Sequence, residues 1–476
     1  MGDSDIPGDP SELPSELLPE LQSELPTELP TGFPSELPTP APEMLVAPRR
    51  RRRWPIAVAG VVVIAVAAAI TVVLTDGGSG SGKQQNAAAT TSARPATSAS
   101  PTASEAPTFD PTNLQMVLDA QSKALLSGDE KAFLAPVDPT AKSAVTAYQR
   151  MYHNLRAMHV KVFSQNPPGS LVDSTPRPVS LMVSYCLVVT TCKDTIANWT
   201  VYVQLEDGKA MITRYIAPGA DNFPGTPLPW QLTTLTAVVG PRVVVATSSD
   251  LASKLPNALK IANHAAVVDD AFAKWGKPSV YVVYLADHAE FPKWFDSQLT
   301  YKQTTAFTTN LSTTDIPATL VMPDSAEFTP GGLTYIMQSE MARVAVEQQE
   351  SSQPPDNTIE EGLADYCGTV GHTNWESYVL QEARSYIRSG KWSHQVYLTK
   401  ETQSSNVDTV NATFGIGYLA VRYLVTTYGL DKMLTFFGDL EHNSQTLDVS
   451  SRDAFGKAWT TVNAAAVKYI EKDLGV

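Results

Sequence analysis

The residues of this chain whose types and spacing could support chemistry are Ser339, Glu340, Arg343 and Glu361. Side chains four positions apart on a helix share a face, so positions 339 and 343 point the same way. A neutral serine hydroxyl is a poor metal ligand, and arginine cannot be deprotonated in a protein. Ser339 as a nucleophile would need a base within reach, and the sequence names none. None of the seven histidines pairs with another at helical ligand spacing.

The stretch around these residues resembles the gluzincin, or peptidase-MA-like, metallopeptidases. The likeness is carried by Leu-Thr-Tyr-Ile-Met-Gln-Ser-Glu-Met-Ala-Arg-Val-Ala at 333–345, Glu-Glu-Gly-Leu-Ala-Asp-Tyr at 360–366, Trp275-Gly276, the strand at 318–322 and residues 418–429. The family places His-Glu-x-x-His on one helix and a third zinc ligand, a glutamate, on the next. Matched position by position, Ser339 and Arg343 stand where the histidines belong, while Glu340 and Glu361 are in place.

This departure predicts a site without zinc and without catalytic residues. A guanidinium at position 343 puts a fixed positive charge where the metal would lie, beside two carboxylates. We therefore expect Arg343 to pair with Glu361 and with Glu340. The alternative is a surface arginine bonded to Glu347, four residues further on. No cofactor is expected, and zinc belongs only to the alternative interpretation of an active enzyme with non-standard ligands.

The elements that must position these residues are expected in a domain at 235–476. β-branched runs at 237–240, 242–247, 279–285 and 318–322 predict strands, and helical spacing covers 251–275. After Gly332 the pattern is helical almost to the end of the chain. A small mixed sheet followed by a mainly helical half is the zincin-like layout that the resemblance implies, and it makes the fold class α+β.

A separate α+β domain is predicted at 109–222. Helical spacing at 114–126, 129–134 and 141–158 precedes strand-like runs at 159–163, 179–189, 199–205 and 209–216. Residues 118–134 and 137–141 resemble the cone-shaped nuclear-transport-factor-like domains that precede peptidase-like domains in bacterial membrane proteins. Such cones include enzymes, binders and spacers, so the fold alone assigns no function. Asp138 is expected to cap a helix rather than act as a base.

The chain has three cysteines. Cys186 and Cys192 stand at the end of one predicted strand and in the turn that follows, and outside the cytoplasm a disulfide between them is expected. Cys367 remains. A buried structural cysteine is the favoured interpretation, and a thiol near the degenerate site is the other.

The N-terminal part predicts a membrane anchor. Residues 55–74 carry no charge and could cross a bilayer as a helix. The arginines at 49–53 and Asp76 predict a cytoplasmic N-terminus and outward-facing C-terminal domains, a single-pass type II arrangement. A cleaved signal peptide fits less well, because the apolar run is longer than a usual signal core. The predicted segments are a disordered, acidic, Pro-rich tail at 1–48, the basic cluster and helix at 49–75, and a disordered Ser/Thr/Ala/Pro linker at 76–108.

The net charge and isoelectric point of the chain narrow the classes of function to consider. The formal net charge of −14 and the isoelectric point near 5.0 argue against a nucleic-acid partner, which requires clustered Lys and Arg. The prediction is therefore a membrane-anchored extracytoplasmic protein with an inactive peptidase-like domain, acting in binding, scaffolding or regulation at the cell surface. A peptide or protein partner could lie along strand 318–322. The alternatives are an active zinc peptidase or other hydrolase with unusual site residues, and a structural envelope protein without a ligand.

Overall fold

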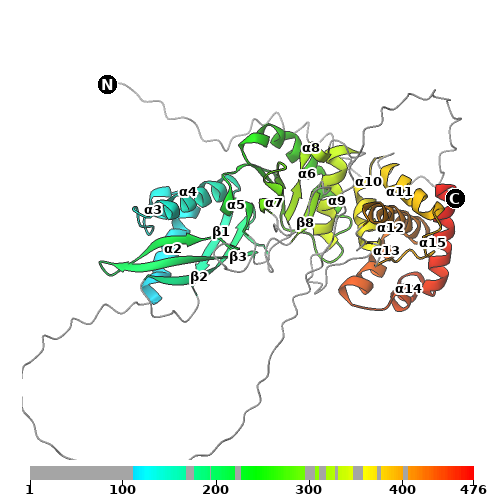
Figure 1. Ribbon diagram of the computed structural model, residues 1–476. Helices are drawn as coiled ribbons and strands as arrows, with labels where there is room; N and C mark the ends of the chain where they lie inside the picture. Colours follow the sequence, from blue (N-terminus) through cyan, green and yellow to red (C-terminus); the bar gives the residue numbers. More distant parts are fainter. Residues whose placement is uncertain are drawn as a thin grey trace, which may run out of the picture. The chain divides into compact units, whose positions relative to one another are not determined.

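The computed structural model describes most of the chain from residue 111 onward (Figure 1). The described residues are 111–167, 176–192, 195–219, 227–294, 306–309, 318–326, 331–346, 358–372, 377–399, 402 and 406–476. The predicted tail, membrane helix and linker lie outside them. Within the described part, no helix is both long and apolar enough to span a bilayer.

Residues 111–219, called the four-stranded region below, begin with three helices. These are α2 (Pro111–Ser127), α3 (Glu130–Leu134) and α4 (Lys142–Ala157). Gly128, at φ +83°, ends α2, and Asp129 caps α3 by accepting a hydrogen bond from the Ala132 N–H at 2.9 Å. The prediction for Asp138 was wrong in its detail. Its carboxylate accepts from Thr140 in the preceding turn, and the N-cap of α4 is Ala141.

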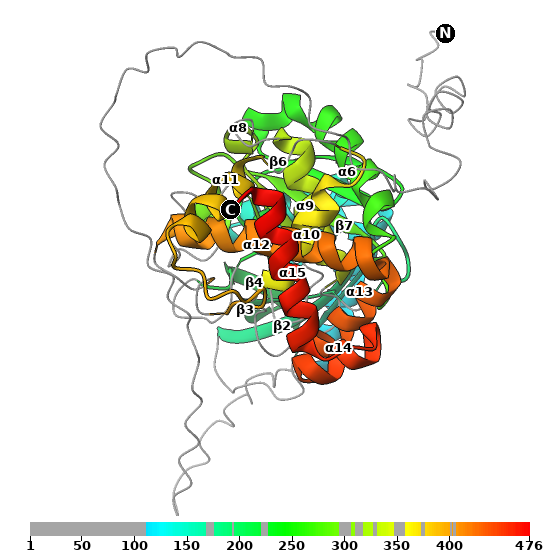
Figure 2. The ribbon, with the colours of Figure 1, turned by 90° about the vertical axis from the view of Figure 1, so that its right-hand side faces the viewer.

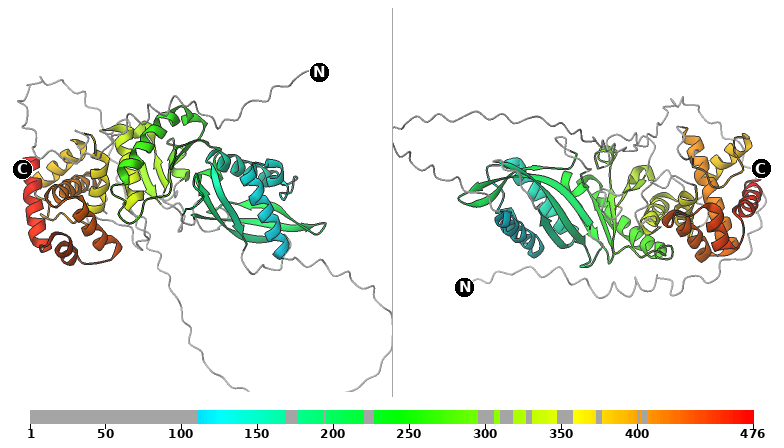
Figure 3. Two further views of the ribbon diagram at one scale, coloured as in Figure 1. Left: turned by 180° about the vertical axis from the view of Figure 1, so that it is seen from behind. Right: turned by 90° about the horizontal axis from the view of Figure 1, so that it is seen from below.

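An antiparallel sheet follows these helices, and its strand order is β1-β2-β3-β4. Figure 3 shows this sheet beside the helices. Its strands are β1 (Val160–Asn166), β2 (Arg177–Leu187), β3 (Thr195–Glu206) and β4 (Lys209–Ile216). Along β2 buried and more exposed side chains alternate, because one face packs on the helices and the other does not. Cys186 and Cys192 are joined in a disulfide at the β2–β3 connection.

Residues 227–476, called the five-stranded region below, contain a mixed sheet in the order β5-β6-β7-β9-β8. Its strands are β5 (Thr236–Val239), β6 (Val243–Thr247), β7 (Tyr281–Leu285), β8 (Ala306–Thr309) and β9 (Ala318–Val321). The inner strands β6, β7 and β9 are parallel and wholly buried, and the outer strands β5 and β8 run antiparallel to their neighbours. Strand β8 was not anticipated from the sequence.

Two longer helices cover one face of this sheet. These are α6 (Leu255–Asp269) and α9 (Gly332–Val346), which bury side chains such as Ala262 and Met341 against β6 and β7. The predicted helix at 251–275 is thus shorter than expected, since α6 is preceded by a 3₁₀ turn, η1 (Ser249–Lys254), and stops at Asp269. The short helices α5 (Pro229–Leu232), α7 (Phe291–Trp294) and α8 (Pro323–Ala326) complete this part.

The remainder of the five-stranded region is helical, as expected. Helix α12 (Val407–Tyr428) packs against α10 (Thr358–Thr369), α11 (Ser377–Arg388), α13 (Leu430–Phe437) and α15 (Trp459–Leu474), with α15 crossing in front of it in Figure 2. A π-helical turn, η2 (Gly438–His442), and α14 (Leu447–Phe455) lie between α13 and α15. Helices α10 and α12 cross at glycines. A Cβ on Gly417 would lie 2.0 Å from the Thr358 carbonyl oxygen, so only glycine permits this approach.

Candidate functional site

The four candidate residues predicted from the sequence lie where α9 meets α10. Helix α9 carries Ser339, Glu340 and Arg343, and α10 carries Glu361. The two helices approach closely at Gly368, where a Cβ would lie 3.0 Å from the Cβ of Ser339. Strand β8 borders the same helix, since the Thr308 hydroxyl donates to the backbone carbonyl of Glu340 at 2.7 Å. The fold therefore brings all four predicted residues into one small volume.

Arg343 pairs with both glutamates, as the sequence predicts. Its Nη1 donates to Oε1 of Glu361 at 3.2 Å, and its Nη2 donates to Oε2 of the same carboxylate. Its Nε lies 3.4 Å from Oε2 of Glu340, as an ion pair. The side chains of Arg343, Glu340 and Glu361 are 14%, 15% and 22% exposed, so the contact is partly desolvated. Glu347, the alternative partner, lies outside the described residues.

A third carboxylate, Asp365, joins this cluster and was missed by the sequence analysis. The Tyr335 hydroxyl donates to its Oδ1 at 2.8 Å, and the Ser339 hydroxyl approaches the same oxygen at 3.4 Å. No described residue donates to its Oδ2. Helical spacing could have found both residues, because Tyr335 stands four positions before Ser339 and Asp365 four positions after Glu361.

Three carboxylates and one guanidinium determine the charge of this site and the pKa values of its acidic groups. Burial, together with the neighbouring charge of Glu361, raises the pKa of Asp365 to about 7, although Tyr335 and Arg343 oppose the shift. Burial also raises the pKa of Glu340, against the attraction of Arg343. A proton on Asp365 would leave two carboxylates around one guanidinium, which is a smaller charge imbalance to bury.

These residues do not fit a zinc ion. The guanidinium of Arg343 contacts both carboxylates that would serve as general base and ligand, and its charge cannot be removed. Among the residues described, no group of three or more His, Cys, Asp or Glu side chains could hold a metal. A bound cation would have to displace Arg343 and face its charge.

Ser339 is poorly arranged as a nucleophile. It is only 4% exposed, and its contact with Asp365 is longer than an ordinary O–H···O hydrogen bond. Tyr335 holds the same carboxylate oxygen at a shorter distance. Asp365 is therefore the candidate base for Ser339 that the sequence did not reveal, but its shorter hydrogen bond is with Tyr335.

Cys367 belongs to the interior rather than to this site. It is fully buried on α10, and its thiol donates to Oδ1 of Asp269 at 3.1 Å. Burial raises the pKa of the Cys367 thiol well above its usual value, and likewise the pKa of Asp269. A neutral, enclosed thiol is a weak nucleophile, so the structural interpretation of Cys367 is favoured.

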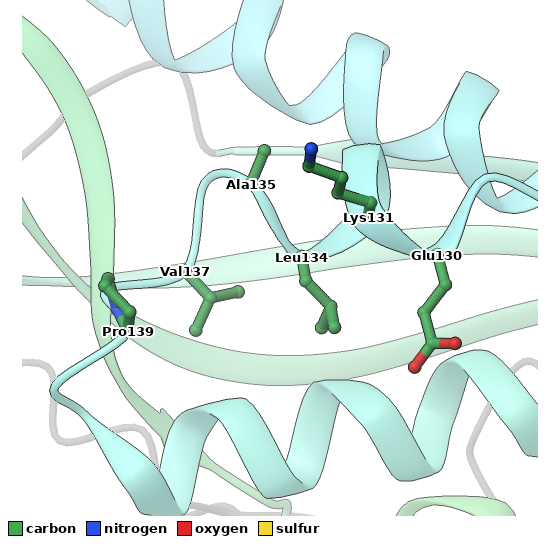
Figure 4. Close-up of a pocket in the computed structure, with 6 residues that line it drawn as sticks. All are labelled: Glu130, Lys131, Leu134, Ala135, Val137 and Pro139. Carbon is green, nitrogen blue, oxygen red and sulfur yellow. The ribbon is translucent and has the colours of Figure 1, made fainter.

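A surface hollow of about 600 Å³ lies in the four-stranded region, along α3 and the turn after it (Figure 4). It is lined by Glu130, Lys131, Leu134, Ala135, Val137 and Pro139. Glu130, Leu134 and Val137 point to one side of this segment, and Lys131 and Ala135 to the other (Figure 4). Because its polar groups do not converge, the hollow offers no evident chemistry.

Comparisons with models of protein families, with curated proteins and with solved structures found no match for this chain. The functional argument therefore depends on the geometry described above.

Proposed function

We propose that this protein is a membrane-anchored, outward-facing protein whose region 235–476 is a non-catalytic relative of the gluzincin metallopeptidases. Its role would be binding, scaffolding or regulation at the cell surface. The observation that carries this proposal is the bidentate contact of Arg343 with Glu361, together with its ion pair to Glu340. The guanidinium supplies internally the positive charge that a metal would otherwise bring.

The layout of the five-stranded region supports the peptidase-like assignment. A mixed sheet precedes the helices, and α9 carries the motif beside the antiparallel edge strand β8. The resemblance to gluzincins was inferred from residues 333–345 and 360–366, which form α9 and the first part of α10. Sequence motif and element order therefore agree with one another.

A peptide partner would bind at β8 rather than at strand 318–322. The reason is that β9, the strand at 318–321, pairs with β7 on one side and with β8 on the other. Its backbone groups are therefore already used. Strand β8 is at the end of the described sheet, so its outer edge is the place where an added strand can pair.

A hydrolase acting through Ser339 is the second candidate. The observation in its favour is the proximity of the Ser339 hydroxyl to Asp365, a carboxylate whose pKa is raised to about 7. An active zinc enzyme with non-standard ligands is less well supported, since Arg343 blocks the metal position.

The metal content of the full chain, purified in detergent, tests the leading proposal. After incubation with zinc sulfate and dialysis, mass spectrometry should find far less than one zinc per chain, and Glu361→Gln should not change that value. One zinc per chain that disappears in Glu361→Gln would contradict the proposal. Hydrolysis of casein by the wild-type chain that is abolished in Ser339→Ala would instead support the second candidate.

The membrane topology needs its own test. In cells expressing the full chain, externally added protease should digest epitopes in the region after residue 111 and leave an epitope in 1–48 intact. Protection of the C-terminal region, or its release in soluble form from washed membranes, would contradict the type II arrangement.

A further inference from the structure

The residues that lead from the four-stranded region into the five-stranded sheet are core residues rather than an exposed connection. Residues 228–235, called the connecting segment below, carry α5 and end directly before β5. Trp230, in α5, is fully buried. Its ring packs edge-on against Tyr185 of β2 at 5.7 Å and against Trp199 of β3 at 6.0 Å. The connecting segment therefore contributes to the hydrophobic core of the four-stranded region.

Asn154, on α4 of the four-stranded region, binds the backbone of the connecting segment. Its Nδ2 donates to the carbonyls of Trp230 at 2.8 Å and Thr233 at 2.7 Å, and its Oδ1 accepts from the Leu235 N–H at 2.8 Å. Asn154 is fully buried, so these three hydrogen bonds are shielded from water. Because Leu235 immediately precedes β5, the start of the five-stranded sheet is bonded directly to α4.

The five-stranded region binds the same segment from its own side. Trp294, on α7, donates from its indole Nε1 to the Thr233 hydroxyl at 3.0 Å. Trp294 is fully buried and packs edge-on against Tyr284 of β7, with ring centroids 6.1 Å apart. Thr233 is therefore bonded through its carbonyl to α4 and through its hydroxyl to α7, and it links the two regions.

One face of the five-stranded sheet shares its hydrophobic core with the four-stranded region. Along β6, Val243 and Val245 pack in the cluster formed with α6 and α9. Val244 and Ala246 point to the other face and belong to the cluster that includes Trp199. The same alternation occurs along β7, as expected for a strand with both faces covered. The four-stranded region thus helps to cover the face that α6 and α9 do not.

Opening one region without the other would cost free energy at this interface. Asn154 would lose three buried hydrogen bonds, and the rings of Trp230 and Trp294 would become exposed. Domains that meet through a small polar interface move independently by default, whereas a large apolar interface removes that freedom. States in which only one region is open should therefore be rare.

We propose that the connecting segment couples the two regions into one cooperative unit, in which neither region opens without the other. The four-stranded region is then a fixed part of a larger fold rather than a module on a flexible linker. A partner that binds one region stabilises both, because stabilisation of the native state is shared across a cooperative unit. This coupling goes beyond the function proposed above and holds whether or not the residues around Arg343 are catalytic.

Hydrogen exchange of the full chain in detergent, followed by mass spectrometry in increasing urea, tests the coupling. In the wild-type chain, the slowest amides of β3 and β7 should exchange with the same dependence on urea, through one shared opening. Asn154→Ala should separate the two curves. The exchange rates of the two strands should then differ by about tenfold or more at one urea concentration, because the lost bonds no longer oppose separate opening.

Asn463→Ala is the matched control. Asn463, on α15, is also buried and also binds a loop through its amide. Its Nδ2 donates to the His394 carbonyl at 3.1 Å, and its Oδ1 accepts from the Val396 N–H at 3.0 Å. Both contacts lie within the five-stranded region. This variant should accelerate exchange in β3 as much as in β7 and keep the two curves together, because the whole unit is destabilised.

Three results would each overturn the proposal: different urea dependences of β3 and β7 in the wild-type chain, acceleration by Asn463→Ala that is confined to β7, or curves that stay together in Asn154→Ala. If Asn154→Ala fails to fold, Trp294→Phe carries the test, since it deletes the indole donor to Thr233 and keeps an aromatic ring.

Discussion

Two clusters of buried polar side chains in this chain differ in how their charges and hydrogen-bonding groups are paired. Around Arg343, the carboxylates of Glu340 and Glu361 face a guanidinium, and Tyr335 donates to Asp365. Around Arg150, several buried side chains have polar atoms without a well-formed hydrogen bond among the described residues, and no described carboxylate pairs with the guanidinium; these side chains are Tyr148, Trp199, Tyr215, Trp230 and Gln231. The charges of the first cluster are paired by its own residues, while the second contains a guanidinium with no described counter-charge.

The two clusters also differ in whether their residues resemble a known enzyme site. The cluster that resembles an enzyme site is the one least able to accept a ligand, because a fixed cation already occupies its centre. The second cluster carries no catalytic motif, and its enclosed polar atoms lack well-formed hydrogen bonds among the described residues.

Removing the central cation should have the largest effect on the first cluster. Arg343→Met leaves Glu340 and Glu361 partly buried without a counter-charge, and we expect a loss of about 3 kcal/mol in the free energy of unfolding. Denaturant unfolding at neutral pH measures it. The double variant Arg343→Met/Glu361→Met should recover much of this loss, because it removes an ionic group from each side. Equal stability of wild type and Arg343→Met would show that the pair contributes nothing.

Asp365 should make the same cluster sensitive to pH. Its pKa is about 7 in the folded chain, against 3.8 as the ordinary value, so the folded state retains a proton that the unfolded state releases. The stability gained from that proton is fully present below the unfolded pKa and is lost as pH rises through about 7. Between these limits, the unfolding free energy of wild type should fall relative to Asp365→Asn, by at most about 1.4 kcal/mol per pH unit.

Unfolding measured across that pH range in both proteins provides the comparison. Asp365→Asn keeps an oxygen that can accept from Tyr335, so a difference between the two proteins reports the ionisation rather than the lost contact. Parallel curves would mean that Asp365 titrates alike in the folded and unfolded states.

The smallest expected effects come from a matched pair of tyrosines. Tyr335→Phe removes a hydroxyl bonded to Asp365 and should cost about 1–2 kcal/mol in the free energy of unfolding. Tyr148→Phe removes a buried hydroxyl that has no well-formed hydrogen bond among the described residues, and it should be neutral or stabilising. Both are followed by thermal unfolding. Equal losses in the two variants would remove the contrast between the clusters.

The sequence allowed the Arg343 pairing to be predicted because it depends on local rules. Helical periodicity puts positions 339, 340 and 343 on one helix, and the motif puts Glu361 on the next. The helices and strands of the four-stranded region were also predicted closely, because each has a clear period. Strand β8 was missed because its four residues, Ala-Phe-Thr-Thr, include no valine or leucine, whereas the equally short β5 and β9 do.

The second cluster, around Arg150, could not be predicted in the same way. Tyr148, Trp199, Tyr215 and Gln231 come from four different elements, and no spacing rule connects them. Each one alone is an ordinary core residue. Only tertiary packing shows that their donors gather beside Arg150 without a carboxylate.

Zinc binding by the variant Ser339→His/Arg343→His tests the central claim most directly. Under the proposed function, α9 and α10 keep the geometry of a zinc site and Arg343 occupies the metal position. Imidazoles at 339 and 343, with Glu361, should bind one zinc per chain, and Asp365 could orient the imidazole at 339. Adding Glu361→Gln should lower that occupancy, while the wild-type chain should hold none. A double variant without zinc, or a wild-type chain with one zinc per molecule, would contradict the account.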